Sequence, residues 1–172
     1  MRKIFITLTL LTLFASTHIH AQVRSYEIST DPNNGEKVLK GLLLRSDIEN
    51  DTAFKWFKDN MKFGQADAAA VAAFKQHAQD IQLVVFGGTW CEDTQFILPK
   101  FFKLQEQAGF PDAGVSFFGV DRTKKTIGGI TDAFKVSNVP TIIVMKDGKE
   151  VGRVVEYGKT GQWDKELAEL LK

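Results

Sequence analysis

The stretch VVFGGTWCEDTQFILPKFF, residues 84–102, decides how this sequence is interpreted. The apolar run that ends at Phe86 is typical of a short strand covered on both faces of a sheet. After two glycines the apolar residues change to spacings of three and four, which predicts an amphipathic helix that begins near Cys91 and ends at Gly109. A buried strand followed directly by a helix is the unit from which α/β folds are built.

The apolar pattern after this helix extends the unit to the order β-α-β-α-β-β-α. It predicts a strand at 115–120, a short helix at 130–136, a strand at 139–145, a strand at 150–156 and a last helix from residue 163. The sequence at 147–148, Asp-Gly, supplies the two positive φ angles of a type I′ turn between the last two strands. This order predicts a mixed sheet with helices on both faces.

The sequence before the strand-and-helix unit is predicted to form an N-terminal extension over residues 22–64, with the main domain over 65–172. Residues 52–63 have the spacing of an amphipathic helix, and the alanine-rich residues 66–79 predict a second helix. The apolar run at 42–44 fits either a strand or the end of a helix, and the pattern leaves both open.

The first 21 residues have the layout of a secretory signal peptide. A basic tip precedes an apolar run from Ile4 to Ala15, and a polar stretch ends at Ala21. The alternative is a membrane anchor, but the run is shorter than the roughly 20 apolar residues that span a bilayer. We therefore expect an exported protein without stable membrane insertion.

Composition excludes several classes of partner and site. The chain has 22 basic and 21 acidic side chains, and loss of Arg2 and Lys3 with the signal peptide would change the formal charge from +1 to −1. Neither net charge favours binding to nucleic acid or to an anionic membrane. His77 is the one histidine left after that cleavage, and a lone histidine on a helix is more simply a surface or capping residue than a ligand. We expect no metal and no cofactor.

Cys91 is the one cysteine of the chain, so no internal disulfide can form. At the start of a helix its sulfur is expected to face unpaired backbone N–H groups and the positive end of the helix dipole, which favour thiolate over thiol. Thr94, one turn later, is placed to donate a hydrogen bond to the sulfur. Glu92 and Asp93 act in the opposite direction, because they raise the cost of a neighbouring negative charge.

An ordered set of residues resembles the thioredoxin family over residues 65–172. The set consists of Trp90-Cys91, Pro99 in the helix, Asp121 at a strand end, Val139-Pro140-Thr141 and Gly158. The resemblance implies a thioredoxin-like three-layer α/β/α fold with a mixed central sheet, here with an N-terminal helical extension. It also implies that Pro140 is a cis-proline against the active-site sulfur, and that the backbone of Val139 pairs with an extended substrate.

Two departures from the family pattern define the predicted chemistry. The family's second active-site cysteine is replaced by Thr94, and its buried acid on the preceding strand is replaced by Val85. The resemblance therefore implies a monothiol protein, in which Cys91 forms mixed disulfides with protein or small-molecule thiols and disulfides and an external thiol or dithiol resolves them. Such a redox partnership favours the periplasm over full secretion.

The predicted site has two catalytic residues, Cys91 and Thr94, and a substrate-binding set consisting of Trp90, Glu92, Asp93, Val139 and Pro140. Simpler interpretations remain open for several of them. Cys91 fits a buried structural cysteine, Trp90 fits plain core, and the two acids fit a helix start better than an acid–base pair. At the level of function, the alternative is a noncatalytic binding or chaperone-like module that retains the peptide groove.

Overall fold

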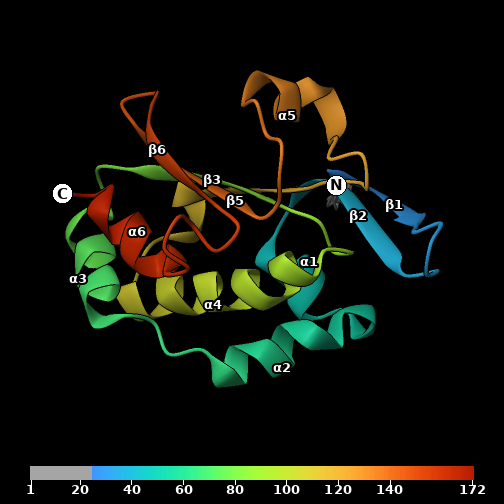
Figure 1. The fold of residues 1–172 in the computed structure, drawn as a ribbon, viewed down its shortest axis with the longest axis horizontal. Helices are drawn as coiled ribbons and strands as arrows, with labels where there is room; N and C mark the ends of the chain where they lie inside the picture. Colours follow the sequence, from blue (N-terminus) through green and yellow to red (C-terminus); the bar gives the residue numbers. More distant parts are fainter. Residues whose placement is uncertain (1–24) are drawn as a thin grey trace, which may run out of the picture.

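The computed structural model describes residues 25–172, and the predicted signal peptide over 1–21 lies outside them. The strands are β1 (Tyr26–Thr30), β2 (Lys37–Leu43), β3 (Gln82–Gly87), β4 (Val115–Gly119), β5 (Thr141–Lys146) and β6 (Lys149–Val155). The α-helices are α1 (Arg45–Glu49), α2 (Lys55–Phe63), α3 (Ala68–Gln76), α4 (Glu92–Ala108), α5 (Ile130–Ala133) and α6 (Trp163–Glu169) (Figure 1). Short 3₁₀ helices lie at Thr52–Phe54, Asp112–Gly114 and Ile127–Gly129.

The strands form one sheet in the order β1-β2-β4-β3-β5-β6. β3 and β4 are parallel, and the other neighbouring pairs are antiparallel, which confirms the predicted mixed sheet. The β5–β6 turn has positive φ at Asp147 and Gly148, as the Asp-Gly sequence predicted. The strand that leads to Cys91, β3, lies between β4 and β5 in the interior of the sheet.

Helices cover the two faces of the sheet unequally. α2, α3, α4 and α6 lie on one face, and the short α5 lies on the other (Figure 1). The larger core fills the first interface and includes the fully buried Phe57, Phe74, Ile97, Phe101 and Leu167. A smaller cluster around Phe86 and Ile143 lies on the α5 face. The three-layer α/β/α architecture is thus confirmed. Within residues 25–172 no helix combines the length and the apolar character needed to cross a bilayer.

The segment before α3 contributes strands as well as helices. β1 and β2 form a hairpin, and β2 pairs with β4, so this hairpin extends the central sheet at one edge. The run at 42–44, for which strand and helix were both open, ends β2 at Leu43. Gly119 allows β2 and β4 to approach each other closely, because a Cβ on Gly119 would lie 2.3 Å from the backbone oxygen of Leu39.

Helix α2 is fastened to α4 at a point where α4 lacks one of its own hydrogen bonds. Pro99 lies inside α4 and has no N–H to return to the carbonyl of Gln95, four residues earlier. The side-chain amide of Asn60, on α2, donates to that carbonyl at 2.9 Å. A polar group exposed by the proline is therefore satisfied from the neighbouring helix.

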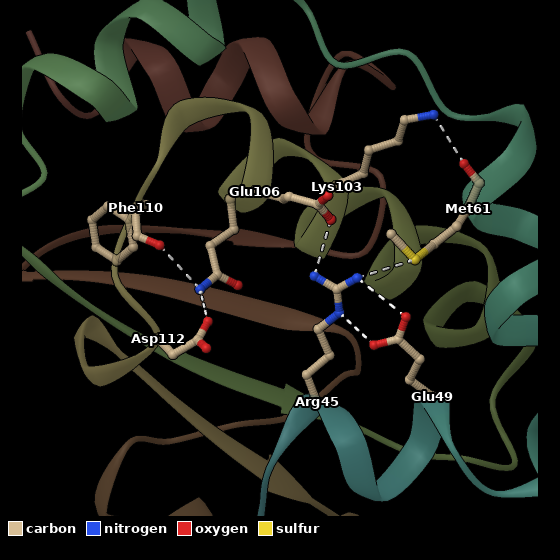
Figure 2. A network of polar contacts seen from close by, with 8 residues as sticks. Arg45, Glu49, Met61, Lys103, Glu106, Phe110 and Asp112 are labelled. Carbon is tan, nitrogen blue, oxygen red and sulfur yellow. Dashed lines mark hydrogen bonds and ion pairs between the residues drawn. The ribbon is translucent and has the colours of Figure 1, made fainter.

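A polar network joins α1 to the same two helices (Figure 2). Arg45 at the start of α1 donates to Glu49 and to Glu106 of α4, and its guanidinium also contacts the sulfur of Met61 on α2. Lys103 of α4 donates to the backbone oxygen of Met61. These contacts hold the N-terminal helices against α4, whose first turn carries the candidate site.

Candidate functional site

Cys91 lies at the junction of β3 and α4, as the N-cap residue of the helix. Its backbone has extended φ and ψ angles of −95° and 121°, its N–H donates to the Gly88 carbonyl and its carbonyl accepts from the Gln95 N–H. The side chain is half-buried. The expected contact between sulfur and the free N–H groups of the first turn is not formed, because the thiol donates to the backbone oxygen of Val139 at 3.2 Å.

The loop before β5 brings Val139 and Pro140 to the thiol across 48 residues of sequence. Both residues are buried, and the peptide bond between them is cis. β5 begins at Thr141, which is opposite Phe86 in the antiparallel β3–β5 pair. This pairing places the loop next to the residues that follow β3, so the structure brings Val139 and Cys91 together.

Thr94 has a different contact from the one expected. The residue is 1% exposed, and its hydroxyl accepts a hydrogen bond from the Gly88 N–H at 3.2 Å. Within the described residues, the Thr94 hydroxyl forms no hydrogen bond with the Cys91 sulfur. The reason is that the Thr94 side chain faces inward. Its methyl group lies so close to Gly87 that a Cβ on Gly87 would be 2.9 Å from it. A catalytic role of Thr94 stays a prediction, while its contacts stabilise the turn before Cys91.

Trp90 is held by three neighbours. Its indole N–H donates to the Val120 backbone oxygen at 2.9 Å. A Cβ at Gly88 would lie 2.6 Å from the indole, so glycine leaves the space that the ring occupies. The Arg122 guanidinium carbon lies 4.7 Å from the ring centre, within the range of a cation–π contact. Trp90 is half-buried and fixed in orientation, so one part of it faces solvent beside Cys91.

The structure adds Arg122 and Asp31 to the site, and neither was predicted from the sequence. Arg122 Nε donates to Asp31 at 2.7 Å, and the Asp31 side chain is fully shielded from solvent. Burial raises the pKa of Asp31, but hydrogen bonds from the Asn33 backbone and from Arg122 outweigh it and leave the pKa below its ordinary value. Arg122 had a sequence signal, because it follows a strand parallel to the one before Cys91, and the carboxyl ends of parallel strands share one edge.

A cleft of about 400 Å³ lies beside the thiol. Its lining consists of Asn34, Glu36, Trp90, Cys91, Glu92, Asp93, Gln95 and Arg122. Three predicted substrate-binding residues, Trp90, Glu92 and Asp93, thus share this cleft with the thiol. The other two, Val139 and Pro140, do not line it and lie instead at the loop that accepts the thiol hydrogen bond.

Tyr157 is a third residue near the site that was not predicted from the sequence. It lies just after β6, the residue is 37% exposed and its ring packs against Phe96 of α4 with the ring centres 5.8 Å apart. Burial raises the pKa of Tyr157, the charge of Asp93 and a hydrogen bond to it raise this pKa further, and Cys91 and Glu92 add to the effect when they are ionised. The available signal was its position directly before Gly158, one of the residues that carried the family resemblance.

Comparisons with known proteins show the family to which the chain belongs. The family model described as Thioredoxin matches residues 53–169, well over half of the chain. Thioredoxin-1 of Saccharomyces cerevisiae is 38% identical over 79 residues, which cover 45% of this chain and 71% of that protein. A thioredoxin of Staphylococcus haemolyticus is 37% identical over 93 residues, covering 53% of this chain and 79% of that protein. The crystal structure of thioredoxin NaTrxh from Nicotiana alata shares 24% identity at a TM-score of 0.40, over 58% of this chain and 80% of that one. The chain belongs to the thioredoxin family.

Proposed function

We propose that this chain is an exported thiol–disulfide exchange protein in which Cys91 acts as a single nucleophile. Its partners are protein or small-molecule disulfides, and an external thiol or dithiol completes the cycle. The observation that carries the proposal is the position of Cys91, half-buried at the N-cap of α4, on the wall of a cleft and in contact with Val139. A structural cysteine needs neither a cleft nor a solvent-accessible sulfur.

The exchange step follows from the chemistry of one thiol. Cys91 loses its proton, its sulfur attacks one sulfur of the substrate disulfide, and the second substrate sulfur leaves as a thiolate that takes up a proton. The Val139 carbonyl then has no S–H to accept from, since the mixed disulfide carries no hydrogen on sulfur. That oxygen becomes free to accept an N–H from an extended substrate chain, the pairing that the family resemblance implies.

Release of the product requires a second molecule. Cys91 is the one cysteine of the sequence, and Thr94 occupies the position of the family's second cysteine. Val85 is fully buried at the position of the family's buried acid. An external thiol must therefore attack the mixed disulfide, and its sulfur forms the new disulfide with the substrate half while Cys91 regains its proton.

The test is the reaction of the full chain with the neutral hydroxyethyl disulfide. Mass spectrometry should detect one added mercaptoethanol group on the wild-type chain and none on Cys91→Ser. The reaction should be at least about tenfold faster in the folded chain than in denaturant, because the folded cleft orients a bound disulfide towards the Cys91 sulfur, whereas the unfolded chain exposes the sulfur without orienting the reagent. An equal rate in both states would overturn the proposal and favour the alternative, a noncatalytic binding module.

Export is tested separately by expression of the full chain in a Gram-negative bacterium. We expect the protein in the periplasm with Gln22 as its first residue, since cleavage is predicted after Ala21. Retention of an uncleaved chain in the cytosol would contradict export and leave the chemistry of Cys91 untouched.

A further inference from the structure

Part of the wall of the Cys91 cleft comes from the N-terminal hairpin. Asn34 and Glu36, which line it, belong to the turn between β1 and β2, whereas Cys91 and Glu92 belong to the β3–α4 junction. In Figure 1 this hairpin lies at the end of the molecule where α4 begins. The cleft therefore depends on a segment that precedes the family match at residue 53.

The hairpin is held to the site by charged and polar contacts. Asp31 accepts from the Asn33 backbone at 2.9 Å, which shapes the turn, and from Arg122 at 2.7 Å. Arg122 in turn lies over Trp90. A separate hydrogen bond of 3.1 Å joins the Thr89 hydroxyl to the Lys37 backbone oxygen. Two independent links thus fix the turn relative to the residues that flank the thiol.

Three of the four charged residues that line the cleft are acidic. Glu36 of the turn faces the same cleft as Glu92 and Asp93 of α4. Among the described residues that line it, Arg122 is the one cation, and its charge is offset by the ion pair with Asp31. The two lysines on β2 are paired as well, Lys37 with Asp51 and Lys40 with Asp121.

We propose that the β1–β2 turn is a specificity-determining wall of this cleft, which makes Cys91 attack disulfides with a cationic group near the reacting sulfur faster than anionic ones. This inference rests on the proposed exchange function. The step is the one given above: the sulfur–sulfur bond of the reagent breaks, Cys91 keeps one half as a mixed disulfide, and the other half leaves as a thiol. The acidic groups attract the cationic reagent and repel the anionic one before bond exchange.

The experiment compares three small symmetrical disulfides that differ chiefly in charge. Cystamine is cationic, hydroxyethyl disulfide is neutral and dithiodipropionate is anionic. Each rate is divided by the rate with a free cysteine peptide, so that intrinsic reactivity cancels. At low ionic strength the corrected ratio of cystamine to dithiodipropionate should be about tenfold, and added salt should reduce it towards one.

Substitutions in the hairpin test whether the β1–β2 turn causes the preference for the cationic disulfide. Glu36→Gln should lower the ratio roughly two- to threefold, since one carboxylate is lost from the wall. Asp31→Asn keeps an acceptor for the turn but removes the ion pair with Arg122, and it should lower the ratio at least as much. Glu27→Gln is the matched control, because Glu27 lies exposed on the same hairpin, outside the cleft lining, and the ratio should not change.

The outcomes separate this inference from the function on which it rests. If the folded chain reacts faster than the denatured chain with the neutral disulfide but shows a corrected ratio of one, the exchange function stands and the wall is not selective. The same conclusion follows if Glu36→Gln and Glu27→Gln lower the ratio equally. If Cys91 is no more reactive in the folded chain with any of the three reagents, the proposed function itself fails.

Discussion

The side chain of Asn60 donates a 2.9 Å hydrogen bond to the backbone oxygen of Gln95, the carbonyl whose helical partner would have been the nitrogen of Pro99. A residue of α2 thereby completes the backbone of α4 one turn after Cys91. The N-terminal helices are thus structurally linked to the first turn of the helix that presents the thiol.

Replacement of Asn60 should destabilise the fold through this carbonyl. Asn60→Ala leaves the Gln95 oxygen without the donor and should cost about 1–2 kcal/mol in the free energy of unfolding, measured by urea denaturation. Lys58→Ala, at an exposed position of the same helix, is the control for changes in helix propensity and should be close to neutral. Equal effects of the two variants would refute the role given to Asn60.

Gly88→Ala should displace the indole of Trp90. A Cβ at this position would lie 2.6 Å from the ring, and overpacking of this kind costs about 1–3 kcal/mol. The cost should fall by at least about 1 kcal/mol when the same change is made in a Trp90→Ala background, because the clash is then absent. If Gly88→Ala lowers the free energy of unfolding equally in both backgrounds, the strain does not come from contact with the Trp90 ring.

Thr94→Cys tests whether the resolving group is what the chain lacks. The new sulfur would lie one turn from Cys91, at a position that is 1% exposed in the structure. We expect insulin reduction by the variant to need a dithiol donor and no added monothiol, since the introduced thiol can attack the mixed disulfide. Thr94→Ser controls for the altered hydrogen bond to Gly88, and a folded but inactive Thr94→Cys chain would contradict the prediction.

The stability contributed by Asp121 should disappear in acid. Burial raises the pKa of Asp121, but hydrogen bonds from Thr123, Lys40 and the Lys125 backbone outweigh it and lower the pKa from 3.8 to about 2. The contribution is therefore fully present above the unfolded value of 3.8 and is lost as the pH falls through the folded value of about 2.

Unfolding of Asp121→Asn measures this contribution. Because the Asp121 side chain is 27% exposed, solvent screening reduces the expected loss at neutral pH to roughly 1 kcal/mol. Well below pH 2, where Asp121 is protonated in both the folded and the unfolded chain, the variant and the wild type should be equally stable. The exposed Asp59→Asn serves as the control, and a difference for Asp121→Asn that persists in strong acid would rule out the ion pair as its source.

Tyr157 reports the negative charge around Cys91. The chain has two tyrosines, so Tyr157 is the one that titrates in a Tyr26→Phe variant, as followed by near-ultraviolet absorbance. The midpoint of the Tyr157 titration should lie above 10.0, the ordinary pKa of tyrosine. Burial is the largest cause, and Asp93 is the next. Asp93→Asn in the same background should lower the midpoint, whereas Asp59→Asn should not move it.

The main domain could be predicted in detail because its signals are local. The β3 run, the spacing of α4 and the Asp-Gly turn each depend on neighbouring residues, and the structure confirms all three. The buried stripe on α4 that includes Ile97 and Phe101 follows directly from helical periodicity.

The contacts of the site were predicted less well. The hydroxyl of Thr94 was expected at the sulfur and instead accepts from Gly88, since its orientation depends on packing beneath Gly87. The sulfur of Cys91 was expected at the helix N–H groups and instead contacts Val139. Both contacts depend on how the chain packs around the site, and the local sequence pattern does not contain that information.

The sequence by itself determined the family, the order of the core elements and the position of one thiol at the start of a helix, because these depend on residue type and short-range spacing. The tertiary structure decided that the β1–β2 turn lines the cleft and that Asp31 holds Arg122 over Trp90. These residues are separated by up to 91 positions, and strand pairing across the sheet brings them together. No periodicity in the chain encodes that contact.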